Sequence, residues 1–323
     1  MNINGTTKIY GLIGNPVAHT LSPLLHNSLA RKMGHNLVYG AFPVLMNKVG
    51  ETVGGAYANA YTNNLEMAIQ GACANANVNT LEMAIRGAHA LGFGGLNVTV
   101  PYKSDVIPFL KAIDPVATRI GAVNTLVRTE DGFVGFNTDN IGLWRTMVSE
   151  DILIKDKEIV ILGAGGAARA AALLCAEENA KRIFILNRTT SKAKDLADKI
   201  NETLTTDILI GMGMDEINKL PETGLIVIQS TSVGMYPHVN EVLINDDDFY
   251  VRIEAGIDMI YNPAETLFMK KIKNNGGKAV NGLKMLFYQG IAAYELWNKV
   301  TVPEEYAEFV YQELEKALTE AVN

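Results

Sequence analysis

The stretch Ile159-Val160-Ile161-Leu162-Gly163-Ala164-Gly165-Gly166-Ala167-Ala168 decides the fold of this chain. Its first four residues form a continuous apolar run, which is typical of a strand buried on both faces of a parallel sheet. A glycine-rich turn follows directly, and a helical pattern over Gly166–Glu178 follows the turn. Strand, turn and helix in this order hold the pyrophosphate of a dinucleotide at the helix N-terminus. The stretch therefore predicts a nucleotide-binding domain, and the alternative is a tight turn with a purely structural role.

The residues after the next predicted strand indicate which nucleotide is bound. The strand Arg182–Leu186 is followed by Asn187, Arg188 and Thr189. An NAD site usually places an acidic residue about twenty positions after the glycines, where it binds the ribose 2′-hydroxyl. No acid stands at this strand end, whereas Arg188 offers a planar cation for a 2′-phosphate. The sequence therefore favours NADP(H) over NAD(H), and the alternative is that Arg188 is a solvated surface cation.

Short apolar runs alternate with helical patterns along most of the chain, which predicts parallel sheets with helices on their faces. The predicted strands are Lys8–Ile13, Leu37–Phe42, Gly95–Val98, Ala122–Arg128, Phe133–Phe136, Glu158–Leu162, Arg182–Leu186, Asp207–Ile210, Leu225–Ile228 and Gly256–Met259. The predicted helices are Ser22–Met33, Leu81–Leu91, Ile141–Ser149, Gly166–Glu178, Ser191–Asn201, Thr266–Asn274, Gly282–Lys299 and Glu304–Ala321.

We expect an α/β protein with two domains. A Rossmann-type dinucleotide-binding domain is predicted over residues 139–282, and an α/β substrate domain over residues 1–138 together with 283–323. The last two helices have no strand left to pair with, so they are expected to pack back on the first domain. Because small-molecule sites often lie between domains, the substrate cleft is expected there.

Composition excludes several classes of protein. The chain has 323 residues, 48% of them hydrophobic and 20% charged, which excludes intrinsic disorder. The net charge of −7 comes without any basic block, so neither nucleic acid nor an anionic membrane is an expected partner. No apolar run approaches the ~20 residues of a membrane span, and no signal peptide is evident. Two cysteines, Cys73 and Cys175, exclude a disulfide framework. We expect a cytoplasmic protein, as a monomer or a homodimer.

A local duplication interrupts the first domain. The segment Leu65–Ile69 recurs as Leu81–Ile85, sixteen residues later. In one continuous helix the two copies would point about 160° apart, so they could not share one core-facing stripe. Two short helices, or one helix and a loose copy, are expected. A duplication tolerated on the surface is the plain interpretation, and an added oligomer contact or lid is the functional one.

Polar residues stand where apolar ones would be expected in the first domain. Asn97 and Thr99 alternate with apolar neighbours and so share one face of a strand. Lys103 lies on the same side if the chain stays extended through Pro101. Asn124 interrupts another apolar strand. Each has a plain alternative: an exposed sheet face for Asn97, and a surface position for Lys103.

Further polar residues lie at helix starts. Thr20 and Ser22 precede a helical pattern, Asp139 stands at a strand-to-helix junction, and Gln289 projects from an apolar helix face. Ser22 and Asp139 could be simple helix caps. Together, however, these hydroxyls and amides suit a polyhydroxylated carbocycle, because every buried ligand hydroxyl needs a partner. The five histidines show no ligand or triad spacing, and metal binding is not expected.

The chain resembles the shikimate dehydrogenase family, including its quinate/shikimate branch. The resemblance covers nearly the whole chain except about residues 57–79. It rests on the glycine turn and on Thr20-Leu21-Ser22-Pro23, Asn97-Val98-Thr99-Val100-Pro101-Tyr102-Lys103, Ala122-Val123-Asn124-Thr125, Asn137-Thr138-Asp139, Asn187-Arg188-Thr189, Thr231-Ser232-Val233-Gly234-Met235, Asp258-Met259-Ile260-Tyr261-Asn262-Pro263 and Gly282-Leu283-Lys284-Met285-Leu286-Phe287-Tyr288-Gln289.

This resemblance implies NADPH-dependent, reversible reduction of 3-dehydroshikimate to shikimate, with Lys103 and Asp139 as the catalytic pair. It implies substrate-binding roles for Thr20 and Ser22 at the carboxylate, for Asn97, Thr99, Asn124 and Gln289 at ring hydroxyls, and for Tyr261 nearby. It implies cofactor-binding roles for Gly163, Gly165, Gly166, Ala167, Asn187, Arg188, Thr189, Met259 and Gly282. The alternatives are a quinate/shikimate dehydrogenase using NAD(P) and a non-catalytic NADP-binding regulatory protein.

Four departures from the family pattern concern the site. Thr20 stands where serine is usual, and Asn140 stands where glycine often follows the aspartate. Gln229 and Ser230 replace the usual Asn-Ala. The stretch between Val44 and Leu81 is longer than usual because it contains the duplicated segment.

Overall fold

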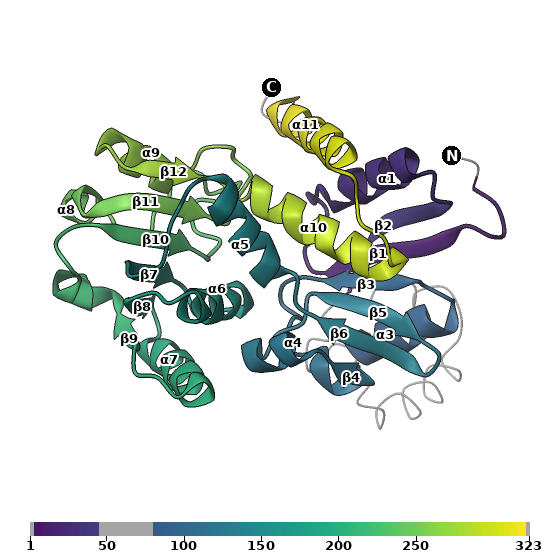
Figure 1. The fold of residues 1–323 in the computed structure, drawn as a ribbon, viewed down its shortest axis with the longest axis horizontal. Helices are drawn as coiled ribbons and strands as arrows, with labels where there is room; N and C mark the ends of the chain where they lie inside the picture. The colour runs from purple at the N-terminus through teal and green to yellow at the C-terminus, as the bar shows by residue number, and fades with distance from the viewer. Residues whose placement is uncertain (1–2, 45–79, 321–323) are drawn as a thin grey trace, which may run out of the picture.

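The glycine-rich stretch opens the second of two six-stranded sheets that lie side by side in the computed structural model (Figure 1). The structure describes residues 3–44 and 80–320. Within these ranges no helix is both long and apolar enough to cross a membrane.

All strands of the second sheet are parallel. Their order across the sheet is β12 (Lys278–Val280), β11 (Ile253–Asp258), β10 (Leu225–Gln229), β7 (Glu158–Leu162), β8 (Arg182–Asn187) and β9 (Leu209–Gly213). Chain order reverses between β7 and β10, and the crevice at the carboxyl ends of such a pair is where doubly wound sheets bind nucleotides. The predicted glycine turn follows β7, so it lies at this point.

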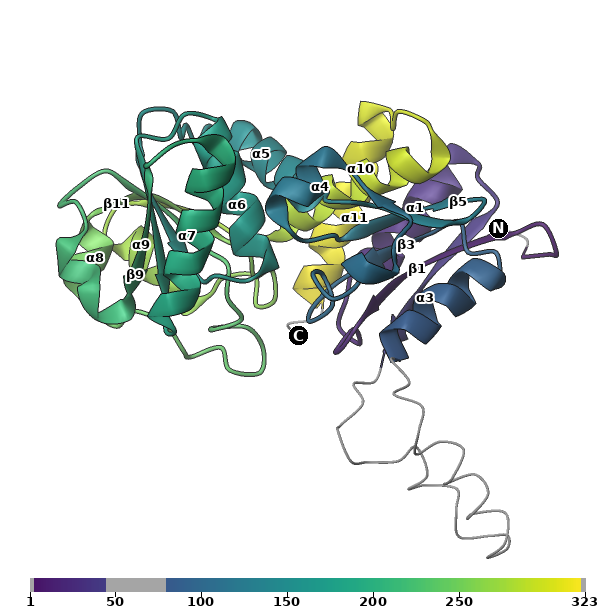
Figure 2. The same cartoon turned by 90° about the horizontal axis from the view of Figure 1, so that it is seen from below.

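β7 is apolar at every position after Glu158, and its side chains are buried on both faces of the sheet. Ile159 and Ile161 belong to a buried cluster with α6 (Gly166–Glu177) and α7 (Thr190–Leu204), which lie together on one face (Figure 2). Val160 and Leu162 belong to a second cluster on the other face. That cluster includes residues of α8 (Asp247–Val251) and α9 (Leu267–Asn274), and a short 3-10 helix, Met214–Lys219, follows β9.

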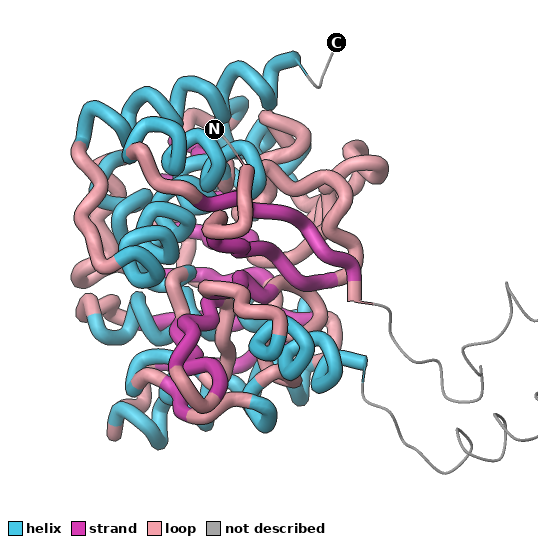
Figure 3. The backbone as a smooth tube through the Cα atoms, turned by 90° about the vertical axis from the view of Figure 1, so that its right-hand side faces the viewer, coloured by secondary structure: helices cyan, strands magenta, loops and turns pink. Residues whose placement is uncertain are grey.

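The first sheet mixes parallel and antiparallel pairs. Its order is β2 (Leu37–Pro43), β1 (Lys8–Gly14), β3 (Gly95–Val98), β5 (Thr125–Thr129), β6 (Gly132–Phe136) and β4 (Ala112–Ile113). β1 runs parallel to β2 and β3, whereas β5 runs antiparallel to both β3 and β6. The helices that flank it are α1 (Ser22–Met33), α3 (Thr80–Ala90) and α4 (Pro115–Ile120), and the strands run between helices in the side view (Figure 3).

The last two helices pack back on the first sheet, as predicted. Residues of α10 (Leu283–Asn298) and α11 (Glu304–Glu320) share a buried core with β1 and α1. α5 (Asp139–Ser149) lies along α10, and the two helices stand between the sheets (Figure 1). Gly142 allows this approach, because a Cβ atom there would lie only 2.8 Å from Gln289 Cβ.

Most predicted elements are present, with a few differences. The strand expected from Ala122 begins only at Thr125, because residues 121–124 turn between α4 and the sheet. The short elements β4, β12, α4, α8 and the 3-10 helix Ile107–Phe109 were not predicted, since two to six residues carry too little periodicity. The second copy of the duplicated segment opens α3 with Leu81 and Ile85 buried. The first copy and Cys73 lie outside the described residues.

Candidate active site

The amine of Lys103 and the carboxylate of Asp139 form the centre of the site. Lys103 Nζ lies 2.6 Å from Asp139 Oδ2, and the two side chains are only 17% and 8% exposed. The surface position considered for Lys103 is therefore wrong. The condition that the chain stays extended through Pro101 is not met, because the chain turns there and Tyr102 N donates to Thr99 O at 3.0 Å. The turn, and not an extended segment, places Lys103 beside Asp139.

Asp139 is the first residue of α5, yet it does not cap the helix. The N-cap is Thr138, whose side chain makes no capping hydrogen bond, and Asp139 N donates to Asn137 Oδ1 at 3.0 Å. Instead, Asp139 Oδ1 accepts from Asn124 Nδ2 at 2.8 Å while Oδ2 faces Lys103. The positive end of the helix dipole further favours the carboxylate. The capping interpretation is therefore wrong, and the structure holds both carboxylate oxygens with fixed partners.

Asn124 connects this pair to its surroundings. Its Oδ1 accepts from Thr138 N at 2.7 Å and from the Thr125 and Thr138 hydroxyls at 3.0 and 3.2 Å. Thr138 Oγ1 also reaches Gln289 Oε1 at 3.5 Å, so α10 enters the network. Gln289 Nε2 donates to its own helix, at Leu286 O. The structure therefore brings Asn124 and Gln289 to the same place as the Lys103–Asp139 pair.

Asn97 lies on the buried side of the first sheet, 4% exposed, so the exposed-face interpretation is wrong. Its Nδ2 donates to Asn124 O at 3.2 Å and to Thr125 Oγ1 at 3.1 Å. Its Oδ1 accepts from the Tyr39 hydroxyl at 2.7 Å. Tyr39 was not singled out in the sequence, because only the pairing of β2 with β1 and of β1 with β3 brings it near Asn97. Thr99 follows β3 directly and packs its methyl group on Gly14.

Thr20 and Ser22 meet at the start of α1. Thr20 Oγ1 lies 3.1 Å from Ser22 Oγ and accepts from Ser22 N at 3.2 Å. The N-cap of α1 is Leu21, without a side-chain cap, so the capping interpretation of Ser22 is wrong. Tyr261, which follows β11 of the other sheet, is close by. Burial raises the pKa of Tyr261, and the nearby backbone of Leu21 and side chain of Thr20 partly offset this rise.

The glycine turn lies against the first sheet. Gly163 has φ of +114°, a conformation that favours glycine, and a Cβ atom there would contact the Ser230 hydroxyl. Ser230 Oγ donates to Leu162 O at 2.6 Å, which ties the end of β10 to the end of β7. A Cβ atom on Gly166 would lie 3.4 Å from Lys103 Cδ. The predicted cofactor turn, including Gly165 and Ala167, is therefore adjacent to the predicted catalytic lysine.

The residues predicted to bind the 2′-phosphate follow β8 and lie at the surface. Asn187 Nδ2 donates to Thr189 O at 3.0 Å, which folds the turn. Arg188 and Thr189 are exposed. The Arg188 guanidinium makes no hydrogen bond or ion pair with any residue that the structure describes. It therefore has all of its donors available for a ligand anion.

Met259 and Gly282 lie together at the carboxyl end of β11. Met259 N donates to Gln229 O at 2.9 Å, and Gly282 N donates to Ile260 O at 2.9 Å. A Cβ atom on Gly282 would collide with the backbone of Met259. Only glycine therefore lets α10 begin so close to the carboxyl end of β11.

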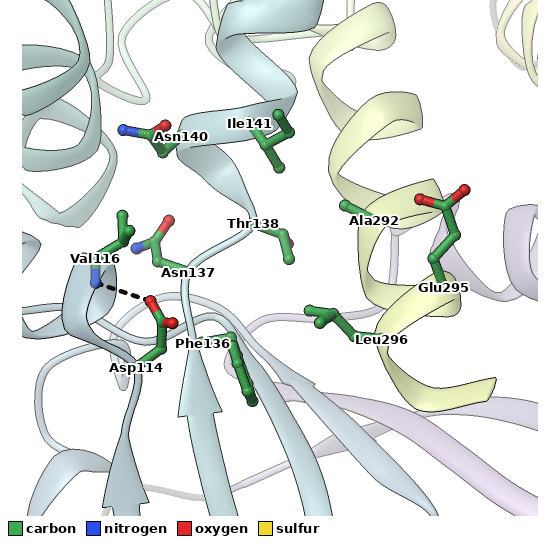
Figure 4. A pocket seen from close by; sticks show the side chains of 10 residues that line it. All are labelled: Asp114, Val116, Phe136, Asn137, Thr138, Asn140, Ile141, Ala292, Glu295 and Leu296. Atoms are coloured by element: carbon green, nitrogen blue, oxygen red, sulfur yellow. Dashed lines mark hydrogen bonds between the residues drawn. The ribbon is translucent and has the colours of Figure 1, made fainter. Parts of the chain in front are cut away.

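A cavity of about 580 Å³ adjoins this site without forming it (Figure 4). It lies between the first turn of α5, the start of α4 and the last turns of α10. Asn137, Thr138 and Asn140 line it, whereas Lys103, Asp139 and Gln289 do not. No group of three or more potential metal ligands occurs in residues 3–44 and 80–320.

Family models match along most of the chain. The model described as shikimate dehydrogenase substrate binding domain matches residues 12–62 and 44–126. Shikimate / quinate 5-dehydrogenase matches residues 147–241, and shikimate 5′-dehydrogenase C-terminal domain matches residues 282–308. A curated shikimate dehydrogenase (NADP(+)) from Methanocaldococcus jannaschii is 37% identical over 92% of this chain and 94% of its own. This chain belongs to the shikimate dehydrogenase family.

Solved structures agree with this assignment. A shikimate dehydrogenase in complex with NADP+ is 36% identical, covers 97% of each chain and has a TM-score of 0.78. A quinate dehydrogenase from Corynebacterium glutamicum in complex with NAD is 25% identical, covers 95% of this chain and 99% of its own, and has a TM-score of 0.76. The resemblance seen in the motifs and the predicted α/β fold class are confirmed, and the chain is an NADP-dependent oxidoreductase of the shikimate dehydrogenase family.

The structure shows the surroundings of two departures from the shikimate dehydrogenase pattern, Gln229 and Asn140. Gln229 is buried at the end of β10, where its Oε1 accepts from Thr231 N and Oγ1 and its Nε2 donates to Val233 O. It therefore fixes the loop after β10, a role that its position at the end of an apolar strand could have indicated. Asn140 Nδ2 is buried without a hydrogen-bond partner among the described residues.

Proposed function

We propose that this chain catalyses the NADPH-dependent, reversible reduction of 3-dehydroshikimate to shikimate. The observation that carries the proposal is the buried Lys103–Asp139 pair at 2.6 Å, packed against Gly166 of the glycine turn. It places a proton-donating amine beside the turn expected to hold the cofactor. The NADP(+)-dependent relatives support the same reaction.

In this reaction NADPH, when bound, supplies the hydride. The protein has to orient the ketone and deliver one proton to the alkoxide oxygen. We assign the proton and the adjacent positive charge to Lys103 Nζ. Asp139 orients this amine, and Asn124 fixes the second oxygen of Asp139, so the carboxylate cannot rotate away.

We assign the remaining predicted residues by their positions around this pair. The substrate carboxylate is assigned to Thr20 and Ser22, and the ring hydroxyls to Asn97, Thr99, Asn124 and Gln289, with Tyr261 beside them. The cofactor is assigned to Gly163, Gly165, Gly166, Ala167, Asn187, Arg188, Thr189, Met259 and Gly282. The division into residues 139–282 and 1–138 with 283–323, a homodimeric state and a cytoplasmic location stay predictions.

An initial-rate assay tests the proposal. NADPH with 3-dehydroshikimate at neutral pH should give rapid turnover, and NADH should be much poorer. The reverse reaction should proceed with shikimate and not with quinate. Comparable rates with quinate would move the chain to the quinate/shikimate branch. No turnover by a folded protein that binds NADPH would contradict the proposal and favour a regulatory role.

A further inference from the structure

The hydroxyl of Tyr39 lies where two groups of assigned substrate residues meet. Tyr39 is on β2 and is 2% exposed. Its hydroxyl donates to Asn97 Oδ1 at 2.7 Å, and Asn97 is assigned to a ring hydroxyl. The Ser22 side chain, assigned to the carboxylate, is near enough to Tyr39 to lower the pKa of Tyr39, which partly offsets the rise that burial causes. One buried oxygen therefore links both ends of the proposed substrate site.

These bonds form a directed chain. Thr20 Oγ1 donates to Ser22 Oγ at 3.1 Å, Ser22 faces the Tyr39 oxygen, and Tyr39 donates its single proton to Asn97. Asn97 in turn donates from Nδ2 to Asn124 O and Thr125 Oγ1. Because a phenol has only one proton to give, its bond to Asn97 Oδ1 fixes which way the Asn97 amide faces.

Packing holds the Tyr39 ring in place. The ring of His26, one turn after Ser22 on α1, stacks on it with centroids 4.2 Å apart and planes at 22°. The centroid of the Trp297 ring lies 6.0 Å from that of the Tyr39 ring. Burial lowers the pKa of His26 to about 3, an effect that nearby Asn97 only partly offsets, so this ring is uncharged and acts by packing. The hydroxyl of Tyr39 therefore has little freedom to move.

We propose that Tyr39 is a positioning residue for the substrate, which sets the geometry of Ser22 and Asn97 without serving the cofactor. The inference rests on the proposed function, because that function gives Ser22 and Asn97 their substrate roles. Removal of the hydroxyl leaves Asn97 Oδ1 buried without its donor and frees the amide to turn. Substrate affinity should suffer, whereas the Lys103–Asp139 pair and the glycine turn stay intact.

The test compares Tyr39→Phe with Tyr294→Phe. Tyr294 belongs to the same aromatic cluster, but its hydroxyl bonds His35 Nδ1 at 2.7 Å, away from the assigned site. Tyr39→Phe should raise KM for 3-dehydroshikimate, and Kd for shikimate by calorimetry, about tenfold, the effect of leaving one buried acceptor unpaired. Its kcat and KM for NADPH should change less than about twofold, and Tyr294→Phe should leave all four values unchanged.

A double variant tests whether Tyr39 affects the substrate through Asn97. If Tyr39 acts through Asn97, adding Tyr39→Phe to Asn97→Ala should raise KM much less than it does in the wild type. Equal effects of Tyr39→Phe and Tyr294→Phe, a loss confined to kcat, or fully multiplicative effects in the double variant would each overturn the inference. A wild-type protein that neither turns over nor binds these substrates would instead overturn the proposed function, and the inference with it.

Discussion

Lys103, in the turn that follows β3 of the first sheet, packs its side chain on Gly166, the first residue of α6, which covers one face of the second sheet. The contact joins the predicted proton donor to the predicted pyrophosphate turn across the boundary between the sheets. Each sheet thus supplies one half of the chemistry, and the geometry of the reaction depends on how closely the two halves meet.

Replacing Lys103 by alanine should abolish most turnover and leave cofactor binding intact. We expect kcat to fall about 10²–10⁴-fold, because general acid catalysis is lost. Kd for NADPH, measured by fluorescence titration, should change little. Lys111→Ala is the matched control, since Lys111 is a surface lysine paired with Asp131 at 3.1 Å. Equal losses of turnover and NADPH affinity would argue against a catalytic role.

Arg188 should decide the preference for NADPH. Loss of charge-assisted hydrogen bonds to a 2′-phosphate should raise KM for NADPH in Arg188→Ala roughly ten- to hundredfold, with KM for NADH unchanged. Arg182→Ala is the control, because Arg182 lies at the opposite end of β8, the strand that Arg188 follows, and pairs with Glu158 at 3.0 Å. A parallel rise in KM for both nucleotides would show that Arg188 acts on something other than the phosphate.

Asp258 should make stability depend on pH. Its side chain is fully buried, and burial raises its pKa from 3.8 to about 6, although Thr266 and Ile260 donate hydrogen bonds to it. Between about pH 4 and pH 6, the Asp258 carboxyl therefore keeps its proton in the folded state and has lost it in the unfolded state. The contribution of Asp258 to the free energy of unfolding is therefore full below about pH 4. It falls by roughly 3 kcal/mol as the pH rises through about 6.

Urea unfolding at several pH values between 4 and 7 would measure this effect. The stability of the wild type should fall relative to that of Asp258→Asn as the pH rises through this window. Asp131→Asn, at an exposed position, should follow the wild type. A constant difference between the wild type and Asp258→Asn across the window would refute the raised pKa.

Two glycine substitutions should act in opposite directions. Gly282→Ala places a methyl group onto the Met259 backbone and should destabilise the fold by about 1–3 kcal/mol or more. Gly87→Ala, in the middle of α3, meets nothing within 4 Å and should stabilise it by about 0.5–1 kcal/mol. Thermal unfolding of both variants gives the comparison. A Gly282→Ala variant as stable as the wild type would contradict the close approach at Gly282, and a destabilised Gly87→Ala would contradict the open space at Gly87.

The sequence predicts the second sheet well because its signals are local. The apolar run of β7, the glycines after it and the helix that follows are neighbours in the chain, so their order alone determines the arrangement. Lys103 was singled out through the resemblance to a family motif, whereas its residue type and local pattern fitted a surface lysine equally well. The turn that places it beside Asp139 depends on tertiary contacts that the local sequence does not show.

Tyr39 and Gln229 show what local signals leave out. By sequence, Tyr39 is an ordinary aromatic residue of a strand. Its place near Asn97 becomes apparent only from the strand pairing, which puts β2 and β3 on either side of β1. Gln229 departs from the family pattern at the end of an apolar strand, and its three hydrogen bonds to the following loop show what it does there. Ser22 and Asp139 fit helix caps equally well by sequence. Ser22 instead bonds its neighbour Thr20, whereas the partners of Asp139, Lys103 and Asn124, come from segments far along the chain.

The shared core of β1, α1, α10 and α11 has a consequence for a chain emerging from the ribosome. The second sheet is complete in sequence once β12 has been made, so it can finish folding while α10 is still being synthesised. The first sheet begins earlier, but the core that it shares with α1 lacks ten of its 18 buried residues until Leu283–Leu318 have emerged. The two halves of the active site are therefore expected to mature in the reverse of their order along the chain.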